Sequence, residues 1–156
     1  MLPALSAFVA ILILGGSGGG SGLGILSSMN VRFIVVDPEG RGTGFDAASR
    51  KEVADIPSSS YGEKYTGPAD GREGDRARSF VASFASPDRL IEGPYTIRVY
   101  GDSSGSFWLS LSVYREPVSE DFNIRGFIRA GDLKVYRLNY AADQSVPITI
   151  DTLRSK

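Results

Sequence analysis

The sequence predicts an all-β protein, an antiparallel β-sandwich of jelly-roll or Ig-like type with about six to eight strands and one long loop. Two observations carry this prediction. Apolar and polar residues alternate with period 2 in several segments, and turns rich in Gly, Pro, Asp or Ser separate these segments. The length of 156 residues is enough for one domain with its own core.

Residues 1–28 precede the predicted domain, which we place at 29–156. Residues 2–14 are an apolar run, LPALSAFVAILIL, and residues 15–22 follow as GGSGGGSG. The run is shorter than the ~20 residues that a membrane-spanning helix needs. Three interpretations stay open: a signal or targeting segment, an apolar peptide fused through an engineered Gly/Ser linker, or a segment without a structural role. Under the fusion interpretation, residues 6–14 would be a donated strand that completes a sheet.

Residues 31–37, VRFIVVD, predict a central and well-buried strand because they are almost continuously apolar. The next residues, Asp37-Pro38-Glu39-Gly40, fit a β-turn with Pro at its second position. Residues 46–57 fit either one or two helical turns capped by Asp46 or an ordered loop across one end of the sandwich, and we prefer the loop.

Residues 58–77 predict the long loop, since Ser, Gly, Pro and charged residues dominate them without periodicity. Asp70, Glu73 and Asp75 in this loop are the candidate metal ligands. Carboxylates are the ligands that Ca²⁺ prefers, although the spacing does not follow the EF-hand pattern and nearby arginines offset the charge. We expect no cofactor, with Ca²⁺ as the one alternative.

The clearest predicted element is a β-hairpin over residues 93–114, with its turn at an Asp/Ser/Gly sequence. The predicted core-facing residues of its two strands alternate with polar ones. They are Tyr95, Ile97 and Val99 in the first strand and Phe107, Leu109, Leu111 and Val113 in the second. Trp108 falls on the opposite, serine-rich face of the second strand.

Four more segments alternate in the same way and are predicted as strands: residues 78–85, 122–129, 133–140 and 146–150. An Ala-Gly-Asp turn at residues 130–132 separates the second and third of these. If the domain closes on itself, the last strand must pair beside residues 31–37. Otherwise an open edge remains that can pair with another chain, including a second copy.

Composition excludes several kinds of chemistry. The chain has no Cys and no His, which removes disulfides, thiolate metal sites and His-dependent catalytic triads. The net charge of −1 leaves no basic excess for binding nucleic acid. We therefore expect no enzyme and no nucleic-acid partner. A carboxylate-based hydrolase that uses residues such as Glu63 or Asp75 stays open as an alternative.

Three aromatic residues are the candidate ligand-binding residues: Trp108, Tyr100 and Tyr114. If residues 93–114 pair as a hairpin, these side chains gather on its wet face and can stack on sugar rings. The competing interpretation is that the 58–77 loop covers and buries all three. Arg98, Arg125 and Arg129 can bind an acidic partner or keep the sheet faces soluble.

Three segments resemble the bacterial pre-peptidase C-terminal (PPC) domain family of secreted β-sandwich modules. Residues 93–99 with 105–109 resemble the family's last two strands, and residues 127–150 resemble its opening strands. VRFIVVDPEGRGTG resembles its middle strand. The order of these segments implies a chain that is circularly permuted or cut from a tandem array. Lys134 stands where the family often has an acidic residue.

The resemblance implies a secreted or cell-surface bacterial protein, a non-catalytic accessory or binding module whose partner is a protein or glycan. The alternative is a self-associating surface or fibre subunit, completed by strand complementation from the N-terminal segment and open to association through an edge strand.

Overall fold

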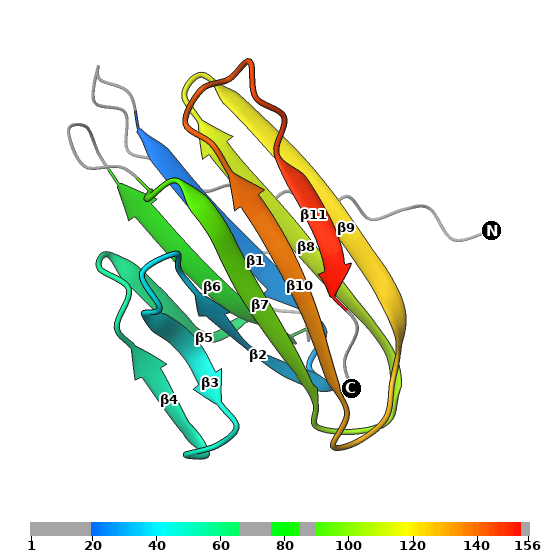
Figure 1. Cartoon of the computed structure of the whole chain (residues 1–156). Helices are drawn as coiled ribbons and strands as arrows, with labels where there is room; N and C mark the ends of the chain where they lie inside the picture. Colours follow the sequence, from blue (N-terminus) through cyan, green and yellow to red (C-terminus); the bar gives the residue numbers. More distant parts are fainter. Residues whose placement is uncertain (1–19, 66–75, 85–89, 154–156) are drawn as a thin grey trace.

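Two antiparallel sheets pack face to face in the computed structural model, which describes residues 20–65, 76–84 and 90–153 (Figure 1). This confirms the predicted all-β antiparallel β-sandwich. No helix occurs in these residues, and consequently none that could cross a membrane. The described strands number eleven, more than predicted: β1 (Ser21–Ser27), β2 (Val31–Val36), β3 (Gly42–Asp46), β4 (Lys51–Ala54), β5 (Ser59–Tyr65), β6 (Arg76–Phe84), β7 (Gly93–Gly101), β8 (Gly105–Arg115), β9 (Val118–Ile128), β10 (Leu133–Tyr140) and β11 (Thr149–Leu153).

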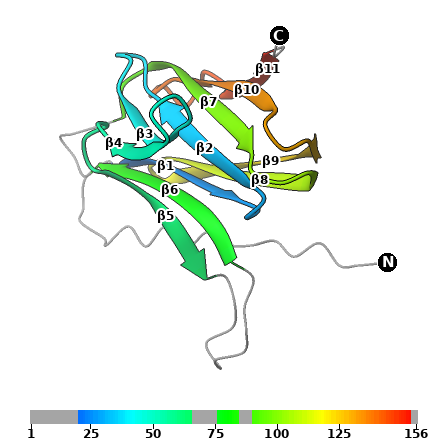
Figure 2. The same cartoon turned by 90° about the horizontal axis from the view of Figure 1, so that it is seen from below.

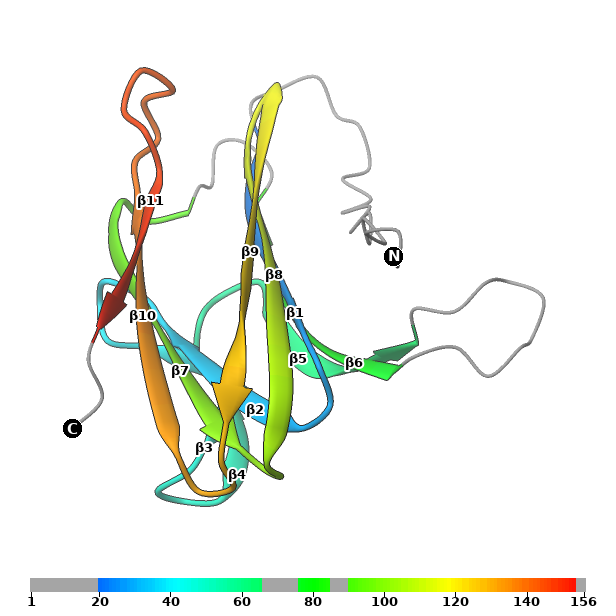
Figure 3. The same cartoon turned by 90° about the vertical axis from the view of Figure 1, so that its right-hand side faces the viewer.

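The strands divide into a five-stranded sheet, order β5-β6-β1-β8-β9, and a six-stranded sheet, order β11-β10-β7-β2-β3-β4. We call them sheet A and sheet B. The two layers are seen edge-on in Figure 3 and from below in Figure 2. Each sheet therefore has an inner face toward the other sheet and an outer face that points away from it.

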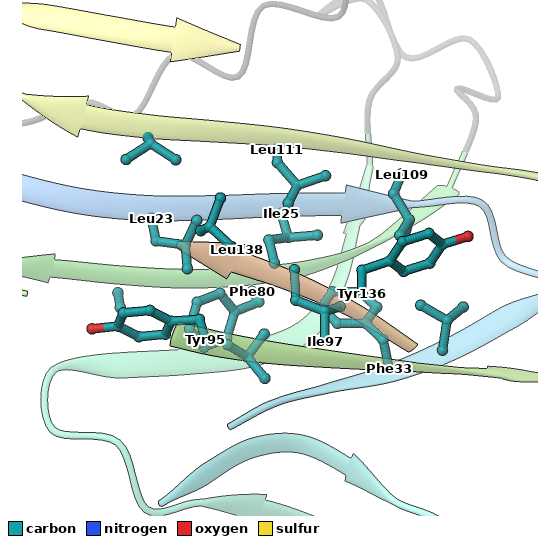
Figure 4. Close-up of a cluster of buried hydrophobic side chains, with 14 of the residues drawn as sticks. Leu23, Ile25, Phe33, Phe80, Tyr95, Ile97, Leu109, Leu111, Tyr136 and Leu138 are labelled. Carbon is teal, nitrogen blue, oxygen red and sulfur yellow. The ribbon is translucent and has the colours of Figure 1, made fainter. Parts of the chain in front are cut away.

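The core fills the space between the two inner faces, where side chains from both sheets meet (Figure 4). The predicted inner faces of β7 and β8 are confirmed, since their core-facing residues are at most 2% exposed. Phe33 of β2 and Phe80 of β6 are fully buried among them. Tyr61 of β5 packs its ring edge-on against Phe33, with 5.2 Å between ring centroids. The apolar surface that these side chains remove from water is the main contribution to the stability of a sandwich.

The predicted hairpin over residues 93–114 is wrong, although both of its strands form. β7 pairs with β10 and β2 in sheet B, while β8 pairs with β1 and β9 in sheet A. The short turn between them crosses from one sheet to the other. It is held by Asn30, whose carbonyl accepts hydrogen bonds from the backbone N–H groups of Asp102 and Ser103. Alternation identifies strands but does not identify their partners.

Part of the Gly/Ser segment belongs to the sandwich. β1 is the central strand of sheet A, with β6 on one side and β8 on the other. Leu23 and Ile25 point into the core and are each 1% exposed. The domain therefore starts before residue 29, and the expected boundary at 28/29 is corrected to lie no later than β1. Residues 6–14, the suggested donated strand, lie outside the described residues.

Two polar segments that we expected to be loops contain strands. The loop interpretation of residues 46–57 is wrong, because β3 and β4 form a hairpin there, and the helical alternative is wrong as well. Asp46 still makes cap-like contacts, since its carboxylate accepts hydrogen bonds from the N–H groups of Ala48 and Ser49. Residues 59–65 form β5 at the edge of sheet A. Edge strands bury little, so their sequences lack clear alternation.

The turns flanking β2 and β10 form as predicted. Gly40 donates its N–H to the Asp37 carbonyl at 2.9 Å, which closes the Asp-Pro-Glu-Gly turn. Asp132 likewise donates its N–H to the Arg129 carbonyl across the Ala-Gly-Asp turn. The last strand, however, pairs with β10 at the edge of sheet B and not beside β2. Of the two alternatives, closure against residues 31–37 does not occur, and β11 is an open edge of sheet B.

A buried arginine ties the two sheets together at each end of the sandwich. Arg78 of β6 donates from Nε to the Val31 carbonyl at 2.8 Å, and its Nη atoms lie 3.5 Å from carboxylate oxygens of Glu63 and Asp102. At the other end Arg115 of β8 is 5% exposed.

Arg115 organises the connection between β10 and β11. Its Nη1 donates to the carbonyls of Ala141, Asp143 and Val146 at 2.8 to 3.1 Å, and its Nη2 pairs with Glu120. In the same connection, hydrogen bonds from the Ser145 backbone and hydroxyl lower the pKa of the Asp143 carboxyl. One guanidinium thus fixes the backbone of this connection at three carbonyl groups.

Candidate binding surface

The three predicted ligand-binding residues do not form one cluster. Trp108 and Tyr114 lie on the outer face of sheet A, because their neighbours Phe107, Leu109 and Val113 point into the core. Tyr100 lies on the outer face of sheet B, where Arg32 is its cross-strand partner. The expected grouping of Tyr100 with the other two is wrong, because β7 and β8 belong to different sheets (Figure 3).

None of the three aromatic side chains is fully buried. Trp108, Tyr100 and Tyr114 are each partly exposed, so the interpretation that a loop buries all of them is also wrong. Residues 59–65 of the supposed covering loop pair with β6 instead.

The outer face of β8 and β9 carries aromatic, charged, amide and hydroxyl side chains. Five cross-strand pairs follow one another along this ribbon. From one end to the other they are Ser106 with Phe127, Trp108 with Arg125, Ser110 with Asn123, Ser112 with Asp121 and Tyr114 with Ser119. We call these ten residues the β8–β9 outer face.

Phe127 is an exposed aromatic residue that was not among the predicted binding residues. Its side chain is 58% exposed, more than any other large hydrophobic residue among those described. Alternation within β9 could have identified it. Phe122, Ile124 and Ile128 have even numbers and share the inner face, so odd-numbered Phe127 must point to the outer face. Phe127 and Trp108 are diagonal neighbours, a spacing that aromatic side chains can bridge with one ligand.

Two polar side chains beside the aromatic pair have no partner among the described residues. No hydrogen bond or ion pair there engages the side chains of Arg125 and Asn123, and both are exposed. Asp121 differs, because the Ser112 hydroxyl donates to its carboxylate. The face therefore offers a guanidinium and a carboxamide, which together can donate and accept hydrogen bonds.

The backbone beneath Trp108 is held in place by the turn between β1 and β2. The Trp108 N–H donates to the Ser28 hydroxyl at 3.2 Å, and the Ser28 N–H donates to the Trp108 carbonyl at 3.1 Å. The Asn30 amide also donates to the Ser106 carbonyl at 3.1 Å. With the other face of β8 packed in the core, these contacts make a rigid base for the aromatic pair.

Tyr100 belongs to a different, self-contained cluster on sheet B. The Arg32 guanidinium lies 4.6 Å from the centre of the Phe45 ring, and Phe45 meets Tyr100 edge-on with centroids 6.4 Å apart. Arg32 also donates from Nε to Asp102 at 2.7 Å. The charge of Arg32 is thus already partnered, and this cluster serves to hold β3 against β2 and β7.

The candidate metal ligands Asp70, Glu73 and Asp75 lie outside the described residues. Among the residues that are described, no group of three or more acidic side chains gathers closely enough to hold a metal ion. The possibility of a Ca²⁺ site thus stays an expectation from sequence.

Fold and surface together define a class: an all-β sandwich that presents an aromatic and polar outer face on one sheet. Comparisons with known proteins add nothing to this class, because no family model, no curated protein and no solved structure matches the chain.

Proposed function

We propose that this protein is a non-catalytic binding module of the cell surface or extracellular space and that it recognises glycans through the β8–β9 outer face. The observation that carries the proposal is a pair of aromatic side chains on one rigid sheet face, the exposed Phe127 and the partly exposed Trp108. An exposed phenylalanine costs solubility, and exposed aromatic groups on an ordered surface commonly mark interaction sites.

Aromatic rings suit sugars because a pyranose ring has an apolar C–H face that packs flat against a π-system. Its hydroxyl groups then point sideways toward polar neighbours. Arg125 and Asn123 stand beside the aromatic pair and supply donors and an acceptor to such hydroxyls. A protein ligand would need a larger apolar core than two aromatic residues provide.

The dimensions favour a chain of sugars over a single one. From Phe127 to Ser119 the face extends along β9 for about 27 Å, at roughly 3.4 Å per residue. The exposed side chains of the face lie mainly along β9, whereas Ser112 of β8 is buried. A monosaccharide would bury little area on such a row of side chains. We therefore propose an extended polysaccharide as the ligand class.

The remaining parts of the proposal rest on the sequence. The absence of His and Cys supports a module without catalytic activity. The extracellular or cell-surface location rests on the resemblance to secreted PPC modules.

The test uses the fact that Trp108 is the chain's one tryptophan. Its fluorescence reports directly on the proposed site during titration with dextran, xylan, polygalacturonate and alginate. We expect at least one of these polysaccharides to change the intensity or emission maximum in a saturable way. Trp108→Ala and Phe127→Ser should each weaken binding, measured by calorimetry, by at least about ten-fold, or about 1.4 kcal/mol.

Tyr100→Ala is the matched control, an aromatic residue removed from the outer face of the other sheet. It should leave the affinity unchanged, provided that the unfolding transition confirms an intact fold. The proposal fails if Tyr100→Ala weakens binding as much as Trp108→Ala does, or if no polysaccharide changes the Trp108 emission.

A further inference from the structure

β9 presents a long free edge. It is the last strand of sheet A, and no described strand pairs with its other side (Figure 1). Its eleven residues make it, with β8, the longest strand of the molecule among those described. Such an edge exposes a row of backbone N–H and C=O groups that can pair with another strand.

The sequence of β9, VSEDFNIRGFI, is complementary to itself when it is reversed about Asn123. In an antiparallel pair centred on this residue, acidic Asp121 faces basic Arg125, and apolar Phe122 faces apolar Ile124. Farther out, Val118 faces Ile128, Ser119 faces Phe127 and Glu120 faces Gly126. Opposite residues of an antiparallel pair lie on the same face of the sheet, so inner residues meet inner residues.

We propose that β9 pairs antiparallel with β9 of a second copy of this chain, in the register centred on Asn123. The contact is isologous, since each copy uses the same surface, and a two-fold axis perpendicular to the sheet passes midway between the two Asn123 residues. The two copies of sheet A become one continuous sheet. On its outer face each Arg125 lies opposite Asp121 of the second copy.

The inner face of β9 has apolar side chains that a second β9 would cover further. Phe122 and Ile124 point toward the core but are only partly buried, unlike the fully buried residues opposite them on β8. Pairing with a second β9 places an apolar residue of the other copy beside each of them. Opposite-charge and apolar cross-strand pairs are the ones that stabilise antiparallel sheets.

The other edge strands do not offer such self-pairing. β11 centred on Asp151 would place that carboxylate against its own copy. β5 centred on Gly62 would place Tyr61 opposite Glu63, and β4 has only four residues. The like charges at Asp151 would destabilise a β11 pair, and Tyr61 opposite Glu63 forms neither an opposite-charge nor an apolar pair, so the β9 edge is the favoured contact.

The inference does not depend on the proposed function, although both involve Arg125, because its test measures molecular mass and not glycan binding. Sedimentation equilibrium of the full chain over a concentration series should give a species of about twice the 16.7 kDa of one chain. A single species at the mass of one chain throughout the series would overturn the proposal.

A charge exchange tests the register. Arg125→Asp places aspartate opposite Asp121 twice in each dimer and should shift the equilibrium to monomer, and Asp121→Arg should do the same by opposing Arg125. The double variant Asp121→Arg with Arg125→Asp restores opposite charges at both positions and should restore the dimer.

Lys64→Asp is the control, with the same change in charge on the other edge strand of sheet A, and it should leave the dimer intact. Circular dichroism checks the fold of every variant. A dimer that survives Arg125→Asp, or a double variant that stays monomeric with its fold intact, would overturn the register.

Discussion

Gly44 decides at the scale of one residue how β3 joins sheet B. Its φ of +136° lies in a region that residues with a side chain rarely adopt. A Cβ atom at this position would lie 2.3 Å from the Phe33 carbonyl oxygen, closer than any real contact. This conformation sets Thr43 into the buried interior, while Phe45 packs against Arg32 and Tyr100 on the outer face.

We predict that Gly44→Ala lowers the free energy of unfolding by about 2–4 kcal/mol, the sum of backbone strain and the clash with the β2 backbone. Urea denaturation followed by circular dichroism measures the change. Gly62→Ala is the control, because a Cβ atom there meets nothing within 4 Å. Its effect should stay within about 1 kcal/mol. Equal effects of the two substitutions would show that Gly44 is not a strained position.

The candidate surface could be predicted from sequence only in part, and single residues show why. Parity placed Trp108 and Tyr114 correctly on the polar face of their strand, because alternation is a local property. Tyr100 also points outward, as the alternation predicts, but it lies on the other sheet. The local sequence does not determine which sheet a strand joins. Alternation along β9 also predicts that Phe127 points outward. That the Arg125 side chain has no partner among the described residues depends on the neighbouring strands and could not be predicted from its own segment.

At the scale of elements, most strands that bury one face in the core were predictable from alternation, as was the edge strand β9, whereas β1, β3, β4 and β5 were not. β2, β7, β8 and β10 alternate or are continuously apolar because the core demands it. β4 and β5 lie at sheet edges and bury too little to leave a pattern. β1 is the instructive case, because it is central and buried, yet its sequence SGLGILS resembles a linker.

We predict that removing residues 1–28 abolishes the fold, because it removes β1. The deletion takes away the buried side chains of Leu23 and Ile25 and leaves the facing edges of β6 and β8 unpaired. Loss of two such core side chains alone costs about 4–10 kcal/mol, comparable with the whole stability of a domain. Circular dichroism and the presence of a cooperative thermal transition measure the outcome.

The matched control is a chain that begins at Gly20, which keeps all eleven described strands. This shorter chain should unfold cooperatively. If the chain that begins at Met29 also unfolds cooperatively and remains soluble, β1 is not needed and the arrangement of sheet A is wrong. The same comparison shows where proteolytic cleavage would be compatible with folding. A cleavage after residue 28 would remove the central strand β1, and a cleavage before residue 20 would not.

At the scale of the whole molecule, buried tyrosines link the stability of the sandwich to alkaline pH. Burial raises the pKa of Tyr61, Tyr95 and Tyr136 above the ordinary value, because the charged tyrosinate is poorly solvated between the sheets. The Tyr95 hydroxyl also donates to the Ile91 carbonyl at 2.9 Å. Because these groups lie on three strands of both sheets, none can ionise freely without disturbing the packing that they share.

The sign of the pH dependence follows from these raised pKa values. Above about pH 10, the tyrosines of the unfolded chain lose their protons while the buried ones in the folded state keep theirs. The unfolded state then binds fewer protons than the folded state. The stability that the buried, protonated tyrosines contribute is therefore complete below about pH 10, and the free energy of unfolding falls as pH rises beyond it. We predict that at most four of the seven tyrosines ionise before the fold is lost.

Absorbance of tyrosinate, recorded together with circular dichroism during an alkaline titration, measures this directly. Tyr95→Phe should lower the stability at neutral pH by about 1 kcal/mol, since its hydrogen bond is lost. The same variant should make the alkaline decline less steep, because one group that keeps its proton in the folded state is gone. Ionisation of all seven tyrosines near pH 10 with an unchanged dichroism spectrum would contradict the burial of these side chains and, with it, the packing of the two sheets.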